Sequence, residues 1–397
     1  MFCFKRILSL ILCFILLSAT VACDSGNTNN VESDDDFVSG NTDTSSKNDV
    51  YSEDSEESSE TEFSYESSAE ISSDTSYESS EYNSVDSSDD TTEDVSIDNG
   101  DRFSVIGPTL ELNKVWENGK MELYNTEFRI SAELEKKLAA QFSSFSNPQS
   151  VALIELDTNM AFFFDKDQKI ATASSIKGPM ALYAYKCIDD GVIGWDTVKT
   201  YQAWHYQANS TGWVQNSPFG TGFNVKTLMD YMIRISDNQA YLMIKELVGV
   251  ENFESMMSAL GSSRIIPQGS NWGYITAFEM AAVWREIYYY SLSSESGAEL
   301  FDRFMHAQYN YIWRAIPQYE AAHKSGWSGK AFNDAGVVFA DGHQYVLVGL
   351  MGRSGIEDQR SQYQFNAVAR LLAELMVEYN AYLDEGISSE TTEESEN

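Results

Sequence analysis

The chain of 397 residues contains few cysteines, histidines or prolines. Cys3 and Cys13 lie in an apolar leader that ends at Cys23. Cys187 is therefore alone in the body of the chain, which excludes a disulfide framework. The four histidines are scattered without the spacing of metal ligands. This argues against a zinc hydrolase, and we predict no metal or other cofactor.

Basic residues are also scarce, since 26 Lys and Arg against 61 Asp and Glu give a net charge of −35. Binding of nucleic acid requires clustered basic residues, so nucleic acid is not an expected partner. Much of the imbalance lies in residues 24–100, where 24 acidic residues and one lysine leave a net charge of −23. This stretch cannot bury enough apolar surface to offset chain entropy. We predict a disordered acidic tether over residues 23–100 and a frayed acidic tail over residues 385–397.

Residues 1–22 have the layout of a secretory signal peptide. A basic start precedes an apolar run over residues 7–17, which is too short to span a membrane as a helix. Small residues then lead to Cys23 and resemble a bacterial lipobox, although Thr20 stands where leucine is usual. We expect Cys23 to be lipidated and to anchor the protein to the outer face of a bacterial cell membrane. Ordinary cleavage and release is the alternative.

The body of the chain, residues 101–384, is organised around one serine. Ser174 begins an apolar helical run, and Lys177 follows three residues later on the same face. The positive end of a helix favours a developing anion. A buried lysine amine with a lowered pKa can accept the proton of a serine hydroxyl. The pattern predicts a nucleophilic serine with a lysine base.

A second motif lies at Ser236-Asp-Asn238, inside a stretch with helical periodicity. The hydroxyl of Ser236 is suited to pass a proton to a leaving nitrogen. The amide of Asn238 is suited to hold a substrate carbonyl. By itself the tripeptide is also typical of a turn or a helix cap.

A third motif, Lys324-Ser325-Gly326-Trp327, precedes a strand. Lys324 and Ser325 offer a cation and a hydroxyl for a substrate carboxylate. Gly326 allows the backbone to approach closely. The backbone N–H of Trp327, with that of Ser174, is expected to form an oxyanion hole.

Periodicity predicts an α/β fold in which both ends of the chain complete one antiparallel sheet around an inserted helical region. Ser131 is a plausible N-cap for the first helix. The expected helices cover residues 130–142, 225–248, 276–290 and 359–382, and the expected strands cover 151–156, 160–164, 336–340 and 344–351.

The order of the three motifs resembles the class A β-lactamase family of penicillin-recognising serine enzymes. The resemblance implies acylation of Ser174 by a β-lactam or a cell-wall peptide, with Lys177 as base and Ser236 as relay. It assigns Asn238, Lys324, Ser325, Gly326 and Trp327 to substrate binding. A monomer is expected.

One departure from the family concerns release of the acyl group. Class A enzymes carry a loop with Glu-x-x-Leu-Asn, whose glutamate activates water. The corresponding residues 260–274 contain no Asp or Glu, and Glu279 just beyond is expected to face solvent. In addition, Asn333 stands about where the family often has an arginine. We therefore expect slow deacylation. The alternatives are a penicillin-binding D-alanyl-D-alanine carboxypeptidase or transpeptidase, and a non-catalytic cell-wall-binding lipoprotein.

Overall fold

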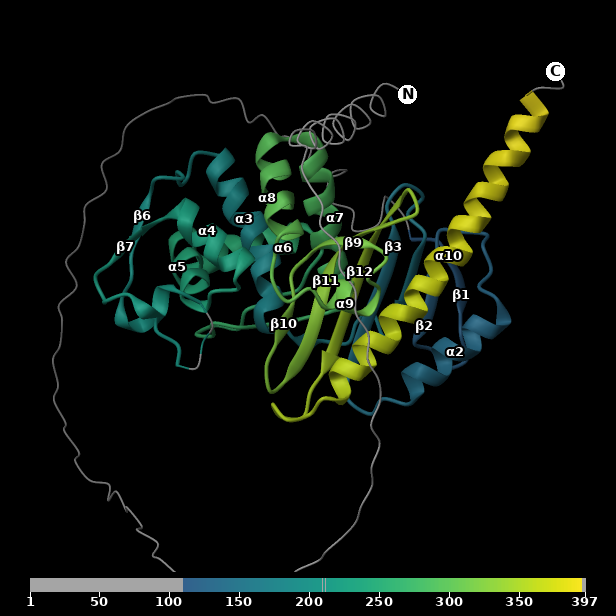
Figure 1. Cartoon of the computed structure of the whole chain (residues 1–397), viewed down its shortest axis with the longest axis horizontal. Helices are drawn as coiled ribbons and strands as arrows, with labels where there is room; N and C mark the ends of the chain where they lie inside the picture. The colour runs from purple at the N-terminus through teal and green to yellow at the C-terminus, as the bar shows by residue number, and fades with distance from the viewer. Residues whose placement is uncertain (1–109, 209, 211, 395–397) are drawn as a thin grey trace, which may run out of the picture. The chain divides into compact units, whose positions relative to one another are not determined.

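The computed structural model describes residues 110–394, except residues 209 and 211, and only the backbone of 387–394 (Figure 1). The expected signal peptide, Cys23 and the acidic tether lie outside the described residues. Within the described part, no helix combines the length and the apolar character that crossing a membrane requires.

An antiparallel sheet forms the centre of the fold, as the sequence predicted. Strand β3 (Gln149–Glu155) follows the first helix of the described part and pairs with β12 (His343–Gly352), so segments about 200 residues apart in the sequence build the same sheet. Along the sheet the order is β1 (Leu112–Val115), β2 (Met121–Tyr124), β4 (Ala161–Phe164), β3 (Gln149–Glu155), β12 (His343–Gly352), β11 (Ala331–Ala340) and β10 (Gly326–Trp327), and β9 (Glu320–His323) also pairs with β11.

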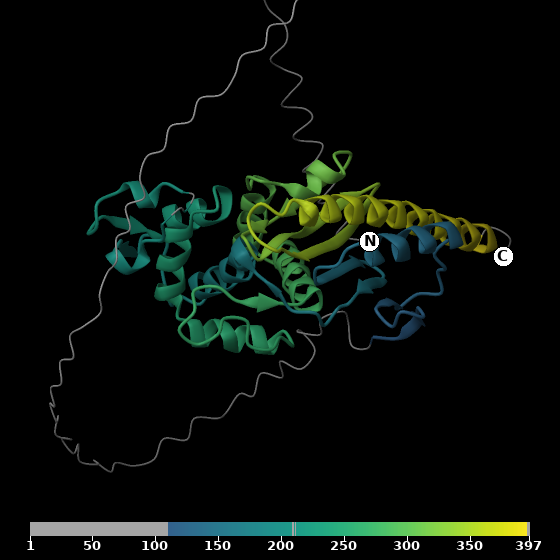
Figure 2. The ribbon, with the colours of Figure 1, turned by 90° about the horizontal axis from the view of Figure 1, so that it is seen from below.

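Two helices from opposite ends of the chain lie side by side on one face of the sheet (Figures 1 and 2). These are α2 (Ala132–Ser143) and α10 (Arg360–Glu394). Ser131 caps α2, and its hydroxyl donates a 2.6 Å hydrogen bond to Glu378 of α10. The predicted end of α10 at residue 382 was too early, since the helix continues to Glu394. The short α9 (Tyr311–Ala315) packs against the same helix.

The helical region covers the other face. Helix α7 (Ala277–Ser293) contacts β3, β11 and β12, and α3 (Lys177–Asp189) packs against α7. The prediction of one helix over residues 225–248 was wrong, because the chain breaks between α4 and α5. The elements are α3 (Lys177–Asp189), α4 (Val225–Arg234), α5 (Asn238–Val248), α6 (Val250–Ala259), α7 (Ala277–Ser293) and α8 (Glu295–Met305), with the strand pairs β5 (Ile170–Ala171) with β8 (Tyr274–Ile275) and β6 (Val198–Thr200) with β7 (Gly222–Asn224).

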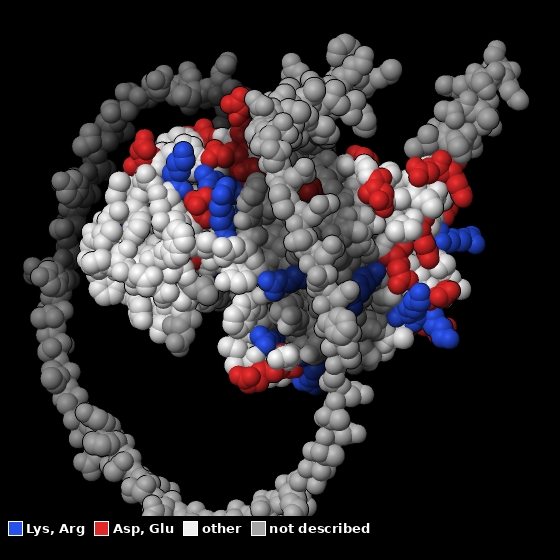
Figure 3. Space-filling model, in the orientation of Figure 1, with Lys and Arg blue, Asp and Glu red and all other residues white. Residues whose placement is uncertain are grey.

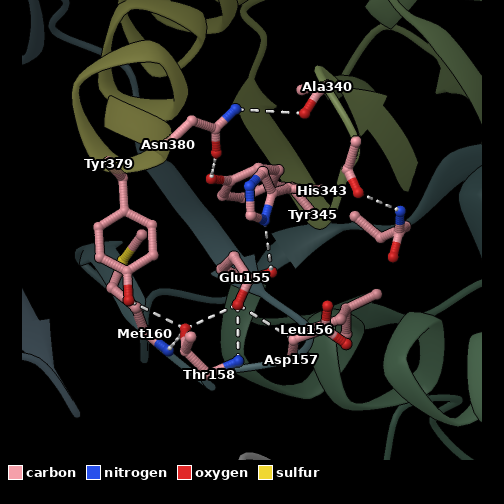
Figure 4. Close-up of polar contacts among 12 residues, drawn as sticks. Glu155, Leu156, Asp157, Thr158, Met160, Ala340, His343, Tyr345, Tyr379 and Asn380 are labelled. Carbon is pink, nitrogen blue, oxygen red and sulfur yellow. Dashed lines mark hydrogen bonds and ion pairs between the residues drawn. The ribbon is translucent and has the colours of Figure 1, made fainter. Parts of the chain in front are cut away.

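A buried carboxylate organises the turns at one end of the sheet (Figure 4). Glu155 ends β3 with no exposed surface. One of its oxygens accepts hydrogen bonds from the backbone of Asp157 and Thr158 and from the Thr158 hydroxyl. The other oxygen lies 3.7 Å from His343 Nδ1, at the start of β12. Glu155 therefore joins the turn between β3 and β4 to the hairpin that begins β12.

Candidate active site

Ser174 lies in a 3₁₀ turn, Ala173–Ile176, directly before α3. A 3₁₀ turn aligns residues three apart, and Lys177 Nζ lies 2.9 Å from Ser174 Oγ. Ala173 has a φ of +44°, a left-handed conformation that is unfavourable for a residue with a side chain. Strain of this kind is stored at sites where the surrounding structure imposes the geometry. The hydroxyl of Ser174 is thus held at a fixed angle beside the amine.

Lys177 is completely buried, and its amine has four polar neighbours. Two of these neighbours can only accept hydrogen bonds. They are the carbonyl oxygen of Ser236 and Oδ1 of Asn238, each 2.6 Å from Nζ. Burial, reinforced by the nearby charge of Lys324, lowers the pKa of Lys177 well below its usual value. A neutral amine has two N–H donors and one lone pair. With both donors used on the two acceptors, its lone pair is left for the hydroxyl of Ser174.

Ser236 lies where the backbone breaks between α4 and α5, with a φ of +58°. The break is fixed by Asp237, whose buried carboxylate caps α5 by accepting from Ala240 N. Its other oxygen accepts from the backbone N–H groups of Trp213 and Val214. Sequence periodicity missed the break because apolar residues continue at helical spacing on both sides. The break places the Ser236 side chain 3.2 Å from Lys177 Nζ.

A second buried amine faces the other side of Ser236. Lys324 Nζ donates to Ser236 Oγ at 3.1 Å and to the carbonyl oxygen of Ser325 at 3.0 Å. Burial lowers the pKa of Lys324 to about 8. The hydroxyl of Ser236 therefore bridges two amines. In the described residues no three His, Cys, Asp or Glu side chains come together as a metal site would require.

Strand β10 lies directly against the serine turn. A Cβ atom at Gly326 would lie 2.7 Å from Ser174 N and 2.4 Å from Ser175 N, so only glycine fits. This contact brings the backbone of Trp327 next to that of Ser174, as an oxyanion hole requires. Asn333 on β11 is buried, and its amide donates to the carbonyl oxygens of Ala171 and Thr172. Asn333 thus supports the strand before the serine instead of facing substrate.

The loop over residues 260–274 is held by two buried carboxylates. Glu254 of α6 accepts from the backbone N–H groups of Ile265 and Ile266. Glu279 was expected to face solvent, and this was wrong: it is 7% exposed. It accepts from Thr276 N in a capping box and from the backbone and hydroxyl of Ser263. Despite burial, these hydrogen bonds lower the pKa of Glu279. Both carboxylates are occupied in shaping the loop.

An aromatic pair lies beside Lys177. The rings of Tyr241 and Trp272 stack with centroids 5.0 Å apart, and Lys177 Nζ lies 5.6 Å from the Trp272 ring centre. Trp272 also lines a cavity of about 560 Å³ next to the serine. Its other lining residues are Ala171, Ala173, Ser174, Gln207, Asn238, Ser270, Gly273, Tyr274, Trp327, Ser328, Gly329 and Lys330.

The sequence matches the model of the β-lactamase enzyme family over residues 133–376. The chain belongs to the β-lactamase enzyme family. The matched span contains all the residues of the three motifs, and membership of this family supports a serine hydrolase. No curated protein matches the sequence.

Solved structures share the β-lactamase/transpeptidase-like fold. PBP-A has a TM-score of 0.58 and 21% identity over 62% of this chain and 97% of its own. A PBP-A mutant, solved as an acyl-enzyme complex with penicillin G, has a TM-score of 0.56 with the same identity and coverage. A β-lactamase from Sphaerobacter thermophilus has a TM-score of 0.53 and 18% identity over 61% of this chain and 96% of its own. At these identities the likeness shows the fold alone.

Proposed function

We propose that this protein is an extracytoplasmic serine enzyme that β-lactams and related peptide amides acylate at Ser174, and that it releases the acyl group slowly. The observation that carries the proposal is the continuous line of contacts from Ser174 through Lys177 and Ser236 to Lys324. It contains a nucleophile, a base of lowered pKa, a relay and a cation.

Acylation follows from these contacts. Lys177, whose lowered pKa favours the neutral amine, takes the proton of Ser174 while Oγ attacks the carbonyl carbon. The new Oγ–C bond forms, and the C–N bond of the amide then breaks. Ser236, in contact with both lysines, passes a proton to the leaving nitrogen. The carbonyl oxygen is stabilised by the backbone N–H groups of Ser174 and Trp327.

Substrate orientation falls to the third motif and to Asn238. Lys324 is an ammonium at neutral pH and, with the hydroxyl of Ser325, is suited to bind a carboxylate next to the leaving nitrogen. The Oδ1 atom of Asn238 is held by Lys177, which leaves the NH₂ group of the same amide to donate to the substrate's acyl carbonyl.

Slow release of the acyl group follows from the loop over residues 260–274. It offers no carboxylate to activate water, and it places Trp272 beside Lys177. Absence of a general base costs about 10²–10⁴ in rate. The same feature favours a cell-wall peptide ending in D-alanine as the natural substrate, in a carboxypeptidase or transpeptidase reaction, because ordinary peptide esters are released more readily than a penicilloyl group.

The test is mass spectrometry of the purified protein mixed with benzylpenicillin and followed over time. We expect one penicilloyl adduct on the Ser174 peptide that persists for hours and is absent in Ser174→Ala. An adduct that disappears within seconds, with consumption of the penicillin, would contradict slow release. Absence of any adduct, with reversible binding that survives Ser174→Ala, would instead establish a non-catalytic binding protein.

The proposed location rests on the leader and Cys23. Two sequence features support it: a signal-like segment and a cysteine after small residues. We expect the protein to fractionate with membranes and to incorporate labelled fatty acid, whereas Cys23→Ser should abolish the labelling. Absence of label on the native protein would remove the anchor from the proposal.

A further inference from the structure

The cavity lies on one side of the nucleophile only. It is lined by Ser174 and Asn238, whereas Ser236, Lys324 and Ser325 are not among its lining residues. Under the proposed function, on which this inference rests, Lys324 and Ser325 take the carboxylate on the leaving-group side. The cavity is then the space for the acyl half of the substrate, the part that stays on the serine.

The walls of this cavity carry one charge. Lys330 is the single charged residue among the thirteen that line it, and none of them is acidic. The wall that contributes Gln207 belongs to residues 200–225, which contain no Asp, Glu, Lys or Arg. In Figure 3 the surface over β6, β7 and α5 is accordingly almost entirely white. The charge of the cavity lining is therefore positive, although the chain as a whole has a net charge of −35.

Lys330 is positioned by its backbone while its side chain is left unpaired. Its carbonyl oxygen accepts from Arg353 N, and its own N–H donates to the hydroxyl of Ser328. Gly329, the preceding residue, accepts from Gly355 N. Among the described residues, no carboxylate lies within ion-pair distance of Lys330 Nζ, whereas six of the twelve other described lysines have such a partner. The turn is thus fixed, and its cation is available to a ligand.

We propose that Lys330 makes the enzyme selective for acyl groups that carry a carboxylate. The acidic group would extend from the reacting carbonyl along the cavity to the Lys330 ammonium. Trp272 and Tyr274 from the opposite loop, together with Trp327, provide apolar surface for the intervening part of the acyl group. The preferred substrate is therefore dianionic, with one carboxylate on each side of the bond that breaks: a peptide with an acidic residue in its acyl half.

Three penicillins that differ at one carbon test this proposal. Benzylpenicillin is neutral in its side chain, carbenicillin carries a carboxylate at the α-carbon, and ampicillin carries an ammonium there. The measured quantity is the second-order rate constant for acylation of Ser174 by each penicillin at low salt. We expect the ratio of carbenicillin to ampicillin to fall about two- to fivefold in Lys330→Gln, the size of an exposed ion pair.

Two variants sharpen the result. Lys330→Glu should lower the same ratio further, and 1 M salt should remove most of the difference between the native protein and Lys330→Gln. Lys226→Gln removes an exposed lysine of α4 with the same change in net charge and should leave the ratio unchanged. An equal ratio in the native protein, Lys330→Gln and Lys330→Glu would overturn the proposal while acylation itself continues. Failure of all three penicillins to acylate would overturn the proposed function, and this inference with it.

Discussion

The indole ring of Trp272 lies beside the amine of Lys177, with Nζ 5.6 Å from the ring centre. The ring stacks on Tyr241, which is fully buried, and this contact fixes the position of the indole. An apolar ring cannot activate a water molecule, and its bulk fills space next to the nucleophile. Under the proposed function, this contact is one reason why the acyl group on Ser174 is released slowly.

Trp272→Glu should introduce the missing base. We expect deacylation of the penicilloyl adduct to accelerate by up to about 10²-fold, the lower range for general-base catalysis. Decay of the adduct is followed by mass spectrometry. Trp272→Gln opens the same space without supplying a base and is the matched control. If the penicilloyl adducts of both variants decay equally fast, deacylation is limited by the exclusion of water by the Trp272 ring. The absence of a base would then not be the cause.

The pKa of Lys324, about 8, predicts the alkaline side of the pH profile. Acylation needs a neutral Lys177 and a charged Lys324. Because the second-order rate constant reports the free enzyme, it should fall as the pH rises through about 8, where Lys324 loses its proton. Lys324→Arg keeps its charge at high pH and should move this fall to higher pH, even if its absolute rate is lower. If the rate constant of Lys324→Arg decreases at the same pH as that of the native protein, the decrease reflects the titration of another group.

Gly326→Ala should disable the serine turn. The added Cβ would lie 2.4 Å from Ser175 N, so either β10 or the turn must move. A displacement of about 1 Å at a reacting group costs about 10² in rate, and we expect at least that loss of acylation. Gly329→Ala is the control in the same cavity, since its Cβ would meet no atom closer than 3.6 Å. Equal rates in the two variants would contradict the assignment of close packing to Gly326.

Glu279→Ala should release the loop over residues 260–274. Loss of hydrogen bonds to a buried carboxylate should lower the free energy of unfolding by about 2–3 kcal/mol, measured by urea denaturation. Glu133→Ala, which removes an exposed ion pair with Lys137, should change the free energy of unfolding much less.

The same carboxylate makes the effect of Glu279→Ala dependent on pH. The folded-state pKa of Glu279 is lowered, so its contribution is fully present above the unfolded value of about 4.5. The contribution is lost as the pH falls through the lower folded value. The difference in stability between the native protein and Glu279→Ala should therefore narrow in acid. A difference that stays constant down to pH 2 would show that the carboxylate charge is not what binds the loop.

The sheet was predictable because its central strands are buried on both faces and read as apolar runs. The order of the three motifs, through its resemblance to class A β-lactamases, also predicted that Ser174, Ser236 and Lys324 share one site. The edge strand β1 and its neighbour β2 were missed; β1 is exposed throughout and shows no clear alternation. Helix α6 was missed because it lies between a glycine turn and an irregular loop.

Side-chain roles that depend on distant partners were beyond the sequence. Glu279 seemed to lie on the polar side of α7, yet Ser263, sixteen residues earlier, folds back onto it. Asn333 occupied the place of a substrate ligand, but its partners are the carbonyl groups before the serine. The capping box Thr276-x-x-Glu279 was a readable signal that would have placed Glu279 at the start of the helix.

The pairing of β3 with β12 also determines how late in folding the active site can form. Gln149 of β3 and its partner Met351 of β12 are 202 positions apart in the sequence, so the central pairing is highly non-local. Such pairings form slowly, because a long loop must close before any contact repays it. The carbonyl groups of Ala171 and Thr172, which precede Ser174, also lack their hydrogen-bond donor until Asn333 of β11 is in place. A chain that lacks β11 therefore has the proposed nucleophile but not the strand that supports it, so acylation requires that β11 has folded against the serine turn.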